Sequence, residues 1–526
     1  MKCKTRAMKI PRQNSILLSI MISVIATVAF SQVPFVTTWQ TDNEGASCNS
    51  CITIPTRLAE YSYEVDWDGD GVYDESGITG DVSHDFGVAG TYTISIRGLF
   101  PSIFFNNRGD RLKLLSVDQW GDNAWEQFTN AFSGCENLDI LATDVPDLSD
   151  VTTLYKCFSN CSSLTRGCAD WDVSNVLVFA YMFEGCSNFN EDIGSWNVSN
   201  GGSMDYMFFG ASSFNQDIGS WDVSNNIVMT GVFAGAQAFN QDISLWDVSN
   251  VEYLAGIFSG ASTFDQDIGS WDVSNVEYMP GMFKEATAFN QDISSWDLSS
   301  VRHMAHMFDG AISFDQPIGS WDVSRSENML DMFRNAKSFN QDLSSWDISN
   351  VVFVQGMFQN ATAFDQDLGS WSFDAVQYGL HMLDSCGMSC ENYTGTLQGW
   401  AANEDVPDSL YIGVGNMKYG GDAIEARTLL LDKGWNLIGD IEVLCTTNTE
   451  YLEVVNFSTY PNPASDVLYT NSVVKGQYSI RELSGALVQQ GALHHGEVDI
   501  TNLRAGIYLL TVEINDKTFT SKFVRE

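Results

Sequence analysis

The chain has 526 residues, of which 44% are hydrophobic and 12% aromatic, so it is too long for one compact core and too apolar to be disordered throughout. Its formal net charge is −41 at pH 7, with 26 Lys and Arg against 67 Asp and Glu. Because phosphate binding needs a basic surface, this balance excludes a nucleic-acid partner.

Residues 1–31 have the pattern of a secretory signal peptide. Basic residues up to Arg12 precede an apolar run from Ile16 to Phe30, with small side chains near its end. A membrane anchor is the alternative, but the run is shorter than the ~20 apolar residues that a span needs. We expect cleavage between Ser31 and Gln32, export, and no membrane span in the mature protein.

Residues 32–112 contain short runs in which apolar and polar residues alternate, as at Tyr92, Ile94 and Ile96, and these predict β-strands. The stretches Y-S-Y-E-V-D-W-D-G-D-G-V-Y-D-E (61–75) and H-D-F-G-V-A-G-T-Y-T-I-S-I-R-G (84–98) resemble a PKD-type module. The resemblance implies a small β-sandwich at this end of the chain.

An acidic turn within this module has the opening of a calcium-binding loop. Its carboxylates belong to Asp66, Asp68, Asp70 and Asp74. The bidentate Glu expected at position twelve is missing, since Gly77 stands there. We favour a purely structural turn and keep calcium as the alternative; no other cofactor is expected.

Residues 113–385 are built on a 25-residue repeat. Its most regular feature is a column of tryptophans, consisting of Trp171, Trp196, Trp221, Trp246, Trp271, Trp296, Trp321, Trp346 and Trp371. Fixed spacing without insertions predicts a repeat solenoid, in which each repeat is one coil and equivalent side chains stack into a continuous core. We expect the tryptophans to form part of that core rather than an exposed platform for glycans or peptides.

Two kinds of local structure are expected in each coil. The apolar residues between Val276 and Ala286 follow roughly helical spacing, whereas Trp296 and Leu298 alternate with polar residues as in a strand. We expect one short strand and one short helix or helical turn per coil, with the strands forming a parallel sheet. A pure β-solenoid is the alternative.

The repeat also carries the phrases F-S-G-C-E-N-L (132–138) and F-N-Q-D-I-G-S-W-D-V-S-N (214–225). These resemble the BspA-like leucine-rich-repeat surface proteins of bacteria. The resemblance implies a leucine-rich-repeat fold, a surface-displayed role in adhesion or protein binding, and no enzymatic activity. Independently, the sequence has no nucleophile elbow in a triad context, phosphate loop or zinc-protease helix.

Two columns of acidic residues run along the array. One consists of Asp192, Asp217, Asp242, Asp267, Asp292, Asp342 and Asp367, and the other of Asp172, Asp222, Asp247, Asp272, Asp297, Asp322 and Asp347, with Asn197 as its neutral member. Because stacked carboxylates repel one another, we expect each to cap a turn and to accept hydrogen bonds from the next coil. Cation bridging is the alternative.

Positions that change from coil to coil are expected to face solvent and are candidates for a ligand-binding face. They are Glu277, Tyr278, Arg302, His303, Val352 and Phe353.

The cysteines fall into two groups. Those within the repeats occupy core positions and are expected to be buried thiols. The pairs Cys48/Cys51 and Cys386/Cys390 are closely spaced and predict local disulfides, with Cys445 left over.

Residues 386–445 and 446–526 end the chain differently. The first segment contains a helix-forming stretch from Ala423 to Leu431 and predicts a helical cap for the array. The second contains Y-P-N-P-A-S-D (460–466), L-R-A-G-I-Y (503–508) and K-F-V-R (522–525), and resembles the type A C-terminal sorting domain of the type IX secretion system of Bacteroidetes. The resemblance implies an antiparallel β-sandwich and recognition by that machinery; a generic β-sandwich adhesion module is the alternative.

These features predict a non-enzymatic binding or adhesion protein that is secreted or displayed on the outer-membrane cell surface, with an extracellular protein or glycan as partner. The alternative is a structural component of a surface layer or matrix, held together by calcium.

Overall fold

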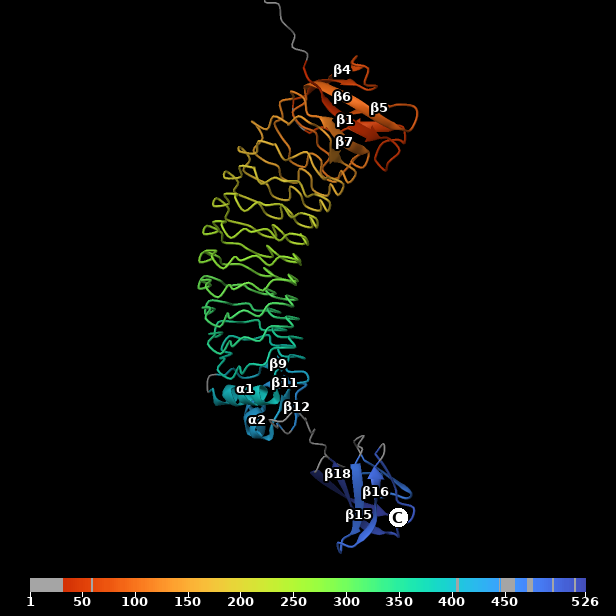
Figure 1. Cartoon of the computed structure of the whole chain (residues 1–526), viewed down its shortest axis with the longest axis vertical. Helices are drawn as coiled ribbons and strands as arrows, with labels where there is room; N and C mark the ends of the chain where they lie inside the picture. The colour runs from red at the N-terminus through yellow and green to blue at the C-terminus, as the bar shows by residue number, and fades with distance from the viewer. Residues whose placement is uncertain are drawn as a thin grey trace, which may run out of the picture.

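The computed structural model describes residues 32–57, 60–403, 406–443, 445, 459–470, 476–493, 496–514 and 517–526. The predicted signal peptide therefore lies outside the described residues, and of its cleavage site only Gln32 is described. A stack of coils runs from an N-terminal β-sheet to a pair of helices (Figure 1).

The N-terminal part is a six-stranded sheet of order β4-β3-β6-β1-β7-β8, accompanied by a two-stranded sheet of β2 and β5. The strands are β1 (Phe35–Gln40), β2 (Cys51–Ile54), β3 (Ser62–Asp66), β4 (Glu75–Ile78), β5 (Val82–Asp85), β6 (Thr91–Leu99), β7 (Leu114–Gln119) and β8 (Asp139–Ile140). The strand predicted around Ile94 is β6, and its side chains Ile94 and Ile96 are buried.

This sheet continues directly into the array. Strand β7 lies beyond the predicted boundary at residue 112, yet it pairs antiparallel with β1 and parallel with β8. Aromatic side chains fill the junction, where Trp120 contacts Phe35 and, at a ring-centroid distance of 5.5 Å, Trp171 of the tryptophan column. The N-terminal sheet thus covers the apolar end that the array would otherwise expose.

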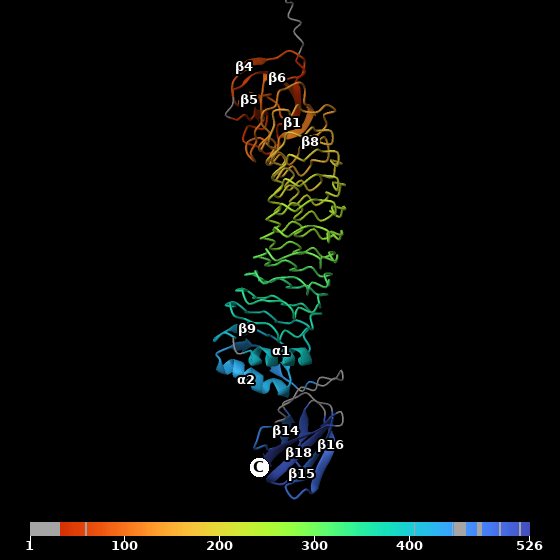
Figure 2. The same cartoon turned by 90° about the vertical axis from the view of Figure 1, so that its left-hand side faces the viewer.

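Successive coils are joined by parallel β-bridges at intervals of 25 residues, so the coils remain in register along the stack (Figure 2). The bridge residues are Thr153, Val178, Ser203, Val228, Tyr253, Tyr278, His303, Asn328, Phe353 and Tyr378. Each coil contributes one bridge residue rather than a strand of several residues.

Of the short helix or helical turn expected in each coil, the array has turns: the segment after each bridge residue forms consecutive tight turns and no helix. In one such segment Gly256 and Gly260 have left-handed φ values of +59° and +70°. Alternate amides donate to the next coil: that of Gly231 to the carbonyl of Ala255, at 2.9 Å, is one example. An α-helix would use these amides within its own turns, so bonding between coils replaces the helix.

The predicted strand around Trp296 and Leu298 is also absent. The two side chains are buried on either side of exposed Asp297, so the alternation is real, but the segment consists of turns and of backbone without regular secondary structure. The bridges between coils lie instead at positions equivalent to Tyr278 and His303.

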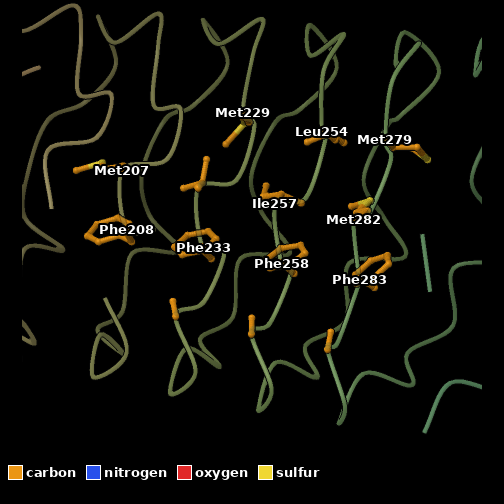
Figure 3. Packing of buried hydrophobic residues seen from close by; sticks show 14 of the residues in the cluster. Met207, Phe208, Met229, Phe233, Leu254, Ile257, Phe258, Met279, Met282 and Phe283 are labelled. Atoms are coloured by element: carbon orange, nitrogen blue, oxygen red, sulfur yellow. The ribbon is translucent and has the colours of Figure 1, made fainter. Parts of the chain in front are cut away.

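The core of the array consists of stacked rows of apolar side chains. The phenylalanine row visible in Figure 3 consists of Phe208, Phe233, Phe258 and Phe283, with ring centroids 5.8–5.9 Å apart. The nine tryptophans of the repeat are at most 4% exposed. Their indole N–H groups donate to the preceding coil, as Trp246 Nε1 does to the carbonyl of Ile218 at 3.1 Å, and Trp171 Nε1 alone among them has no partner.

Two helical segments follow the array. The first is α1 (Cys390–Ala402), which is followed by the short strands β9 (Tyr411–Gly413) and β10 (Lys418–Tyr419). The second consists of the 3₁₀ helix η1 (Gly421–Ala423) and α2 (Ile424–Asp432), and it is followed by β11 (Asn436–Ile438) and β12 (Ile441–Glu442). Helix α2 coincides with the predicted helix. Because Gly379 bridges to Ile412 and β9 pairs in parallel with β11, the ladder of the array continues through the cap.

The disulfides correct one prediction. Cys48 is bonded to Cys51 as predicted, but Cys390 is bonded to Cys445 and not to Cys386. Cys386 is a buried free thiol that points toward the sulfur of Met417, at 3.6 Å. The cysteines of the repeats are likewise free and buried.

The C-terminal residues form two antiparallel sheets around a separate apolar core. One has the order β13-β14-β17 and the other β16-β15-β18-β19. Their strands are β13 (Thr459–Tyr460), β14 (Val467–Thr470), β15 (Gly476–Glu482), β16 (Leu487–Leu493), β17 (Glu497–Asp499), β18 (Gly506–Ile514) and β19 (Lys517–Arg525).

One buried polar side chain gives a stability test. Asn226 is fully buried where most coils have Val, and its Oδ1 atom accepts no hydrogen bond. An unsatisfied buried acceptor costs about 1–3 kcal/mol, so Asn226→Val is expected to raise the melting temperature. In the opposite direction, Val251→Asn should lower it. A melting temperature that Asn226→Val lowers would contradict this account.

Candidate functional site

The aspartates of the two columns cap turns within their own coils. Asp242 Oδ1 accepts from the amide of Ser244 at 2.9 Å, and Asp247 Oδ1 from that of Ser249 at 3.0 Å. Asn197 makes the same bond to Ser199 without a charge. The expected turn capping is present, whereas neither Asp242 nor Asp247 accepts a hydrogen bond from the following coil. Asp367, at the end of its column, does accept one from the next layer, from Thr396 Oγ1 at 3.0 Å, so that part of the prediction holds there but not at Asp242 and Asp247.

Side-chain hydrogen bonds between coils come from other positions of the repeat, many of them occupied by Asn or Gln. Asn275 Nδ2, for example, donates to the carbonyl of Ser249 at 2.7 Å. A second ladder was missed by sequence reasoning: Asn215 Oδ1 accepts from the amide of Asn240 at 2.9 Å and from Gln241 Nε2 at 3.0 Å. The recurrent N-Q pair of the repeat was the signal that could have predicted it.

The acidic loop of the N-terminal sheet brings together three of the four predicted calcium ligands. Carboxylate oxygens of Asp66, Asp68 and Asp74 lie within 4.8 Å of one another, and Asp70 is not part of the group. Both oxygens of buried Asp66 accept backbone amides, from Gly69 at 2.8 Å and from residue 71 at 2.9 Å. The loop is therefore held by its own backbone, and these oxygens are also of the type that calcium prefers.

The predicted ligand-face residues lie together on one side of the array. Tyr278, His303 and Phe353 are bridge residues, and Glu277, Arg302 and Val352 immediately precede them. The structure adds Tyr253 and Tyr378, which the sequence reasoning missed although they occupy the same position of the repeat. We call Tyr253, Tyr278, His303, Phe353 and Tyr378 the aromatic stripe.

The rings of the aromatic stripe stack on one another from coil to coil. Centroids of Tyr253 and Tyr278 are 5.1 Å apart, and those of Tyr278 and His303 are 4.9 Å apart. The planes differ by 6° and 17°, so ring faces cover one another and ring edges point outward. Tyr253, Phe353 and Tyr378 are 38%, 37% and 49% exposed.

Asn328 interrupts the aromatic stripe between His303 and Phe353. Its Oδ1 atom is turned back to accept from the amide of Leu330, at 3.0 Å. Beside the stripe, Arg302 forms ion pairs with Glu277, at 3.9 Å, and with Glu327, at 3.3 Å. The face therefore combines apolar ring edges with charged side chains.

Comparison with protein families identifies the repeat. The family model described as "Mycoplasma protein of unknown function, DUF285" matches residues 126–244, 227–310 and 292–396, which together span more than half of the chain. The chain belongs to the DUF285 family. This match fits the resemblance of the repeats to those of BspA-like surface proteins. No curated protein matches the chain.

A second family model matches the end of this DUF285 protein. Residues 458–526 match the secretion system C-terminal sorting domain. The protein therefore belongs to the type IX secretion class and is secreted, then anchored at the cell surface or released. Neither family is described as enzymatic. Within the part of the chain that the structure describes, no helix has the length and apolar character of a membrane span.

The turn caps predict how the array responds to acid. Four of the capping residues, Asp242, Asp247, Asp292 and Asp297, accept hydrogen bonds from the side chain and the backbone of the Ser two residues later. These bonds lower the pKa of each carboxyl group below the ordinary 3.8. Because the folded-state pKa is depressed, this stabilisation is complete above 3.8 and is lost as pH falls through the lowered values. Replacing the four by Asn, which caps without charge as Asn197 does, should flatten the fall of melting temperature below pH 4. An unchanged acid dependence would contradict the capping role.

The acidic loop predicts that calcium does not change the stability of the protein. Because backbone amides already satisfy Asp66, we expect the melting temperature to be the same with calcium as with a chelator, and Asp68→Asn to change neither value. A large stabilisation by calcium that Asp68→Asn removes would instead establish a metal site.

Proposed function

We propose that this DUF285 protein is a non-enzymatic binding protein of the cell exterior, an adhesin whose array presents the aromatic stripe to an extracellular protein. In this proposal the array is a leucine-rich-repeat-like solenoid and the N-terminal sheet is a PKD-like module that covers its end. The observation that carries the proposal is the aromatic stripe, because exposed rings continue over several coils that otherwise bury their aromatic side chains.

The composition of the face supports a binding role. Contiguous exposed apolar surface on a soluble protein marks an interaction site more often than isolated apolar residues do. Tyrosine and arginine are also enriched among the residues that contribute most to the affinity of protein interfaces. The aromatic stripe and Arg302 combine these properties within consecutive coils.

The geometry of the rings favours a protein over a glycan as partner. A sugar packs its C–H groups on the face of an aromatic ring, but both faces of Tyr278 are occupied, by Tyr253 and His303, and Tyr278 in turn covers one face of each of these two rings. The exposed ring edges suit contacts with aromatic and aliphatic side chains, because edge-to-face aromatic pairs are favourable.

The test is a binding screen of the chain from Gln32 to Glu526 against extracellular proteins and glycans. Replacing Tyr278, Phe353 and Tyr378 by Ser is expected to weaken binding to the protein ligand by about tenfold or more. The matched control is Leu245→Ser, which removes an 86% exposed apolar side chain and restores the Ser that most other coils have there.

Three outcomes would contradict the proposal. They are the absence of any ligand in the screen, equal binding by the stripe variant and the control, and hydrolysis of a screened glycan or protein. Sedimentation with and without calcium tests the matrix alternative, which would show calcium-dependent assembly of the chain.

A further inference from the structure

Positive charge is concentrated in one part of the array. Residues 126–385 contain seven Lys and Arg, and five of them lie between residues 284 and 337. These five are Lys284, Arg302, Arg325, Arg334 and Lys337. A chain of net charge −41 therefore carries a basic island on neighbouring coils.

A ladder of asparagine side chains that links successive coils is interrupted in the same part of the array. Asn275 and Asn350 donate to the carbonyls of Ser249 and Ser324, at 2.7 and 2.8 Å, as part of the asparagine ladder. Ser300 and Arg325 occupy the two intervening positions of this ladder. Neither makes the corresponding bond, so two consecutive coils within the array lack a contact that the coils on either side of them make. A local departure of this kind is expected at a functional site.

A surface hollow of about 400 Å³ lies at this interruption. It is lined by Arg302, Arg325, Glu327, Asn350 and Val352. Arg302 is paired with Glu327, at 3.3 Å. Arg325 is exposed and has no ion pair or hydrogen bond with any residue that the structure describes. The hollow therefore offers an unpartnered guanidinium group to an incoming ligand.

We propose that the hollow binds a carboxylate of an acidic segment of the protein partner, with Arg325 as its anchor. The proposal rests on the function proposed above and names the charge that the partner must carry. A guanidinium group forms paired hydrogen bonds with a carboxylate, which makes Arg the preferred residue for this contact. Val352 and the neighbouring Phe353 of the aromatic stripe supply apolar surface for the aliphatic stem of a Glu side chain.

The surrounding charge makes this site selective. Because the rest of the chain is strongly acidic, an anionic polymer is repelled elsewhere on the surface. A polyanion can therefore approach the array at the basic island, where the hollow with Arg325 supplies the contact that holds it. Added salt should weaken binding at Arg325 less than it would weaken a purely long-range attraction. The reason is that charges in direct contact are screened less than distant charges are.

The test uses poly-L-glutamate as the probe, with the chain from Gln32 to Glu526. Fluorescence anisotropy of the labelled polymer should show binding at about 0.05–0.15 M salt. At this ionic strength neighbouring charges on a protein surface still interact. Poly-L-glutamine is the neutral control polymer, and polygalacturonate presents the same carboxylate chemistry on a glycan.

The principal variant is Arg325→Asn, which removes the charge and restores the asparagine ladder. It should reduce binding of poly-L-glutamate by about tenfold or more while leaving the melting temperature unchanged or higher. Lys337→Asn is the matched control, since it removes one exposed positive charge of the same region outside the hollow, and it should retain binding. Arg302→Gln, a second variant in the hollow, should also weaken binding.

Each contrary result has a definite meaning. Equal loss in Arg325→Asn and Lys337→Asn, or no binding of poly-L-glutamate, overturns the carboxylate site. Preferential, Arg325-dependent binding of polygalacturonate assigns the hollow to an acidic glycan and overturns the acidic protein segment. If Arg325→Asn keeps full affinity for the ligand found in the screen while the stripe variant loses it, the carboxylate site is wrong and the proposed function stands.

Discussion

The array depends on hydrogen bonds between the backbone amides of one coil and the carbonyls of the next. These bonds include the one from the amide of Phe233 to the carbonyl of Ile257. They form only if the donor and acceptor atoms of neighbouring coils lie opposite one another along the whole bonded segment. An insertion within the bonded segment of a coil would move the later donors of that segment away from their acceptors, whereas the longer coil between Leu383 and Gly413 keeps these bonds because its extra residues lie outside the segment. The strict 25-residue period, the left-handed turn positions and the stacked rows of Phe and Trp all follow from this single requirement.

The same requirement separates structural residues from residues that are free to vary. The Asn and Gln ladders, the capping Asp residues and the buried aromatic rows serve the bonding between coils or the turns within them, so they recur. A bridge residue contributes only its backbone to the ladder, and its side chain can therefore change. This freedom lets Tyr253, His303 and Asn328 occupy equivalent positions, and it explains why a binding face can be varied without disturbing the stack.

Much of this organisation could be predicted from the sequence, because residues that recur at a fixed spacing must occupy equivalent positions in successive coils. Periodicity identified the coils and the Trp column, and local propensity identified α2. Apolar spacing did not distinguish a short helix from tight turns, because it records which side chains are buried, whereas alternate amides of this segment find their partners 24 residues further along the chain. The bond between Cys390 and Cys445 was missed for a similar reason, since proximity in sequence favoured Cys386. Tyr253 and Tyr378 belonged to a visible column, but only the structure shows that the rings of this column stack.

The disulfide between Cys390 and Cys445 also has a mechanical meaning. It links the first residue of α1 to the point where the chain leaves the cap, and it encloses both helices in a loop with a sequence separation of 55. If the protein is held at a cell surface through its C-terminal side while a ligand pulls on the array, the load passes through this covalent bond. The cap is thereby protected from being peeled away strand by strand, and tension reaches the stacked coils as a whole.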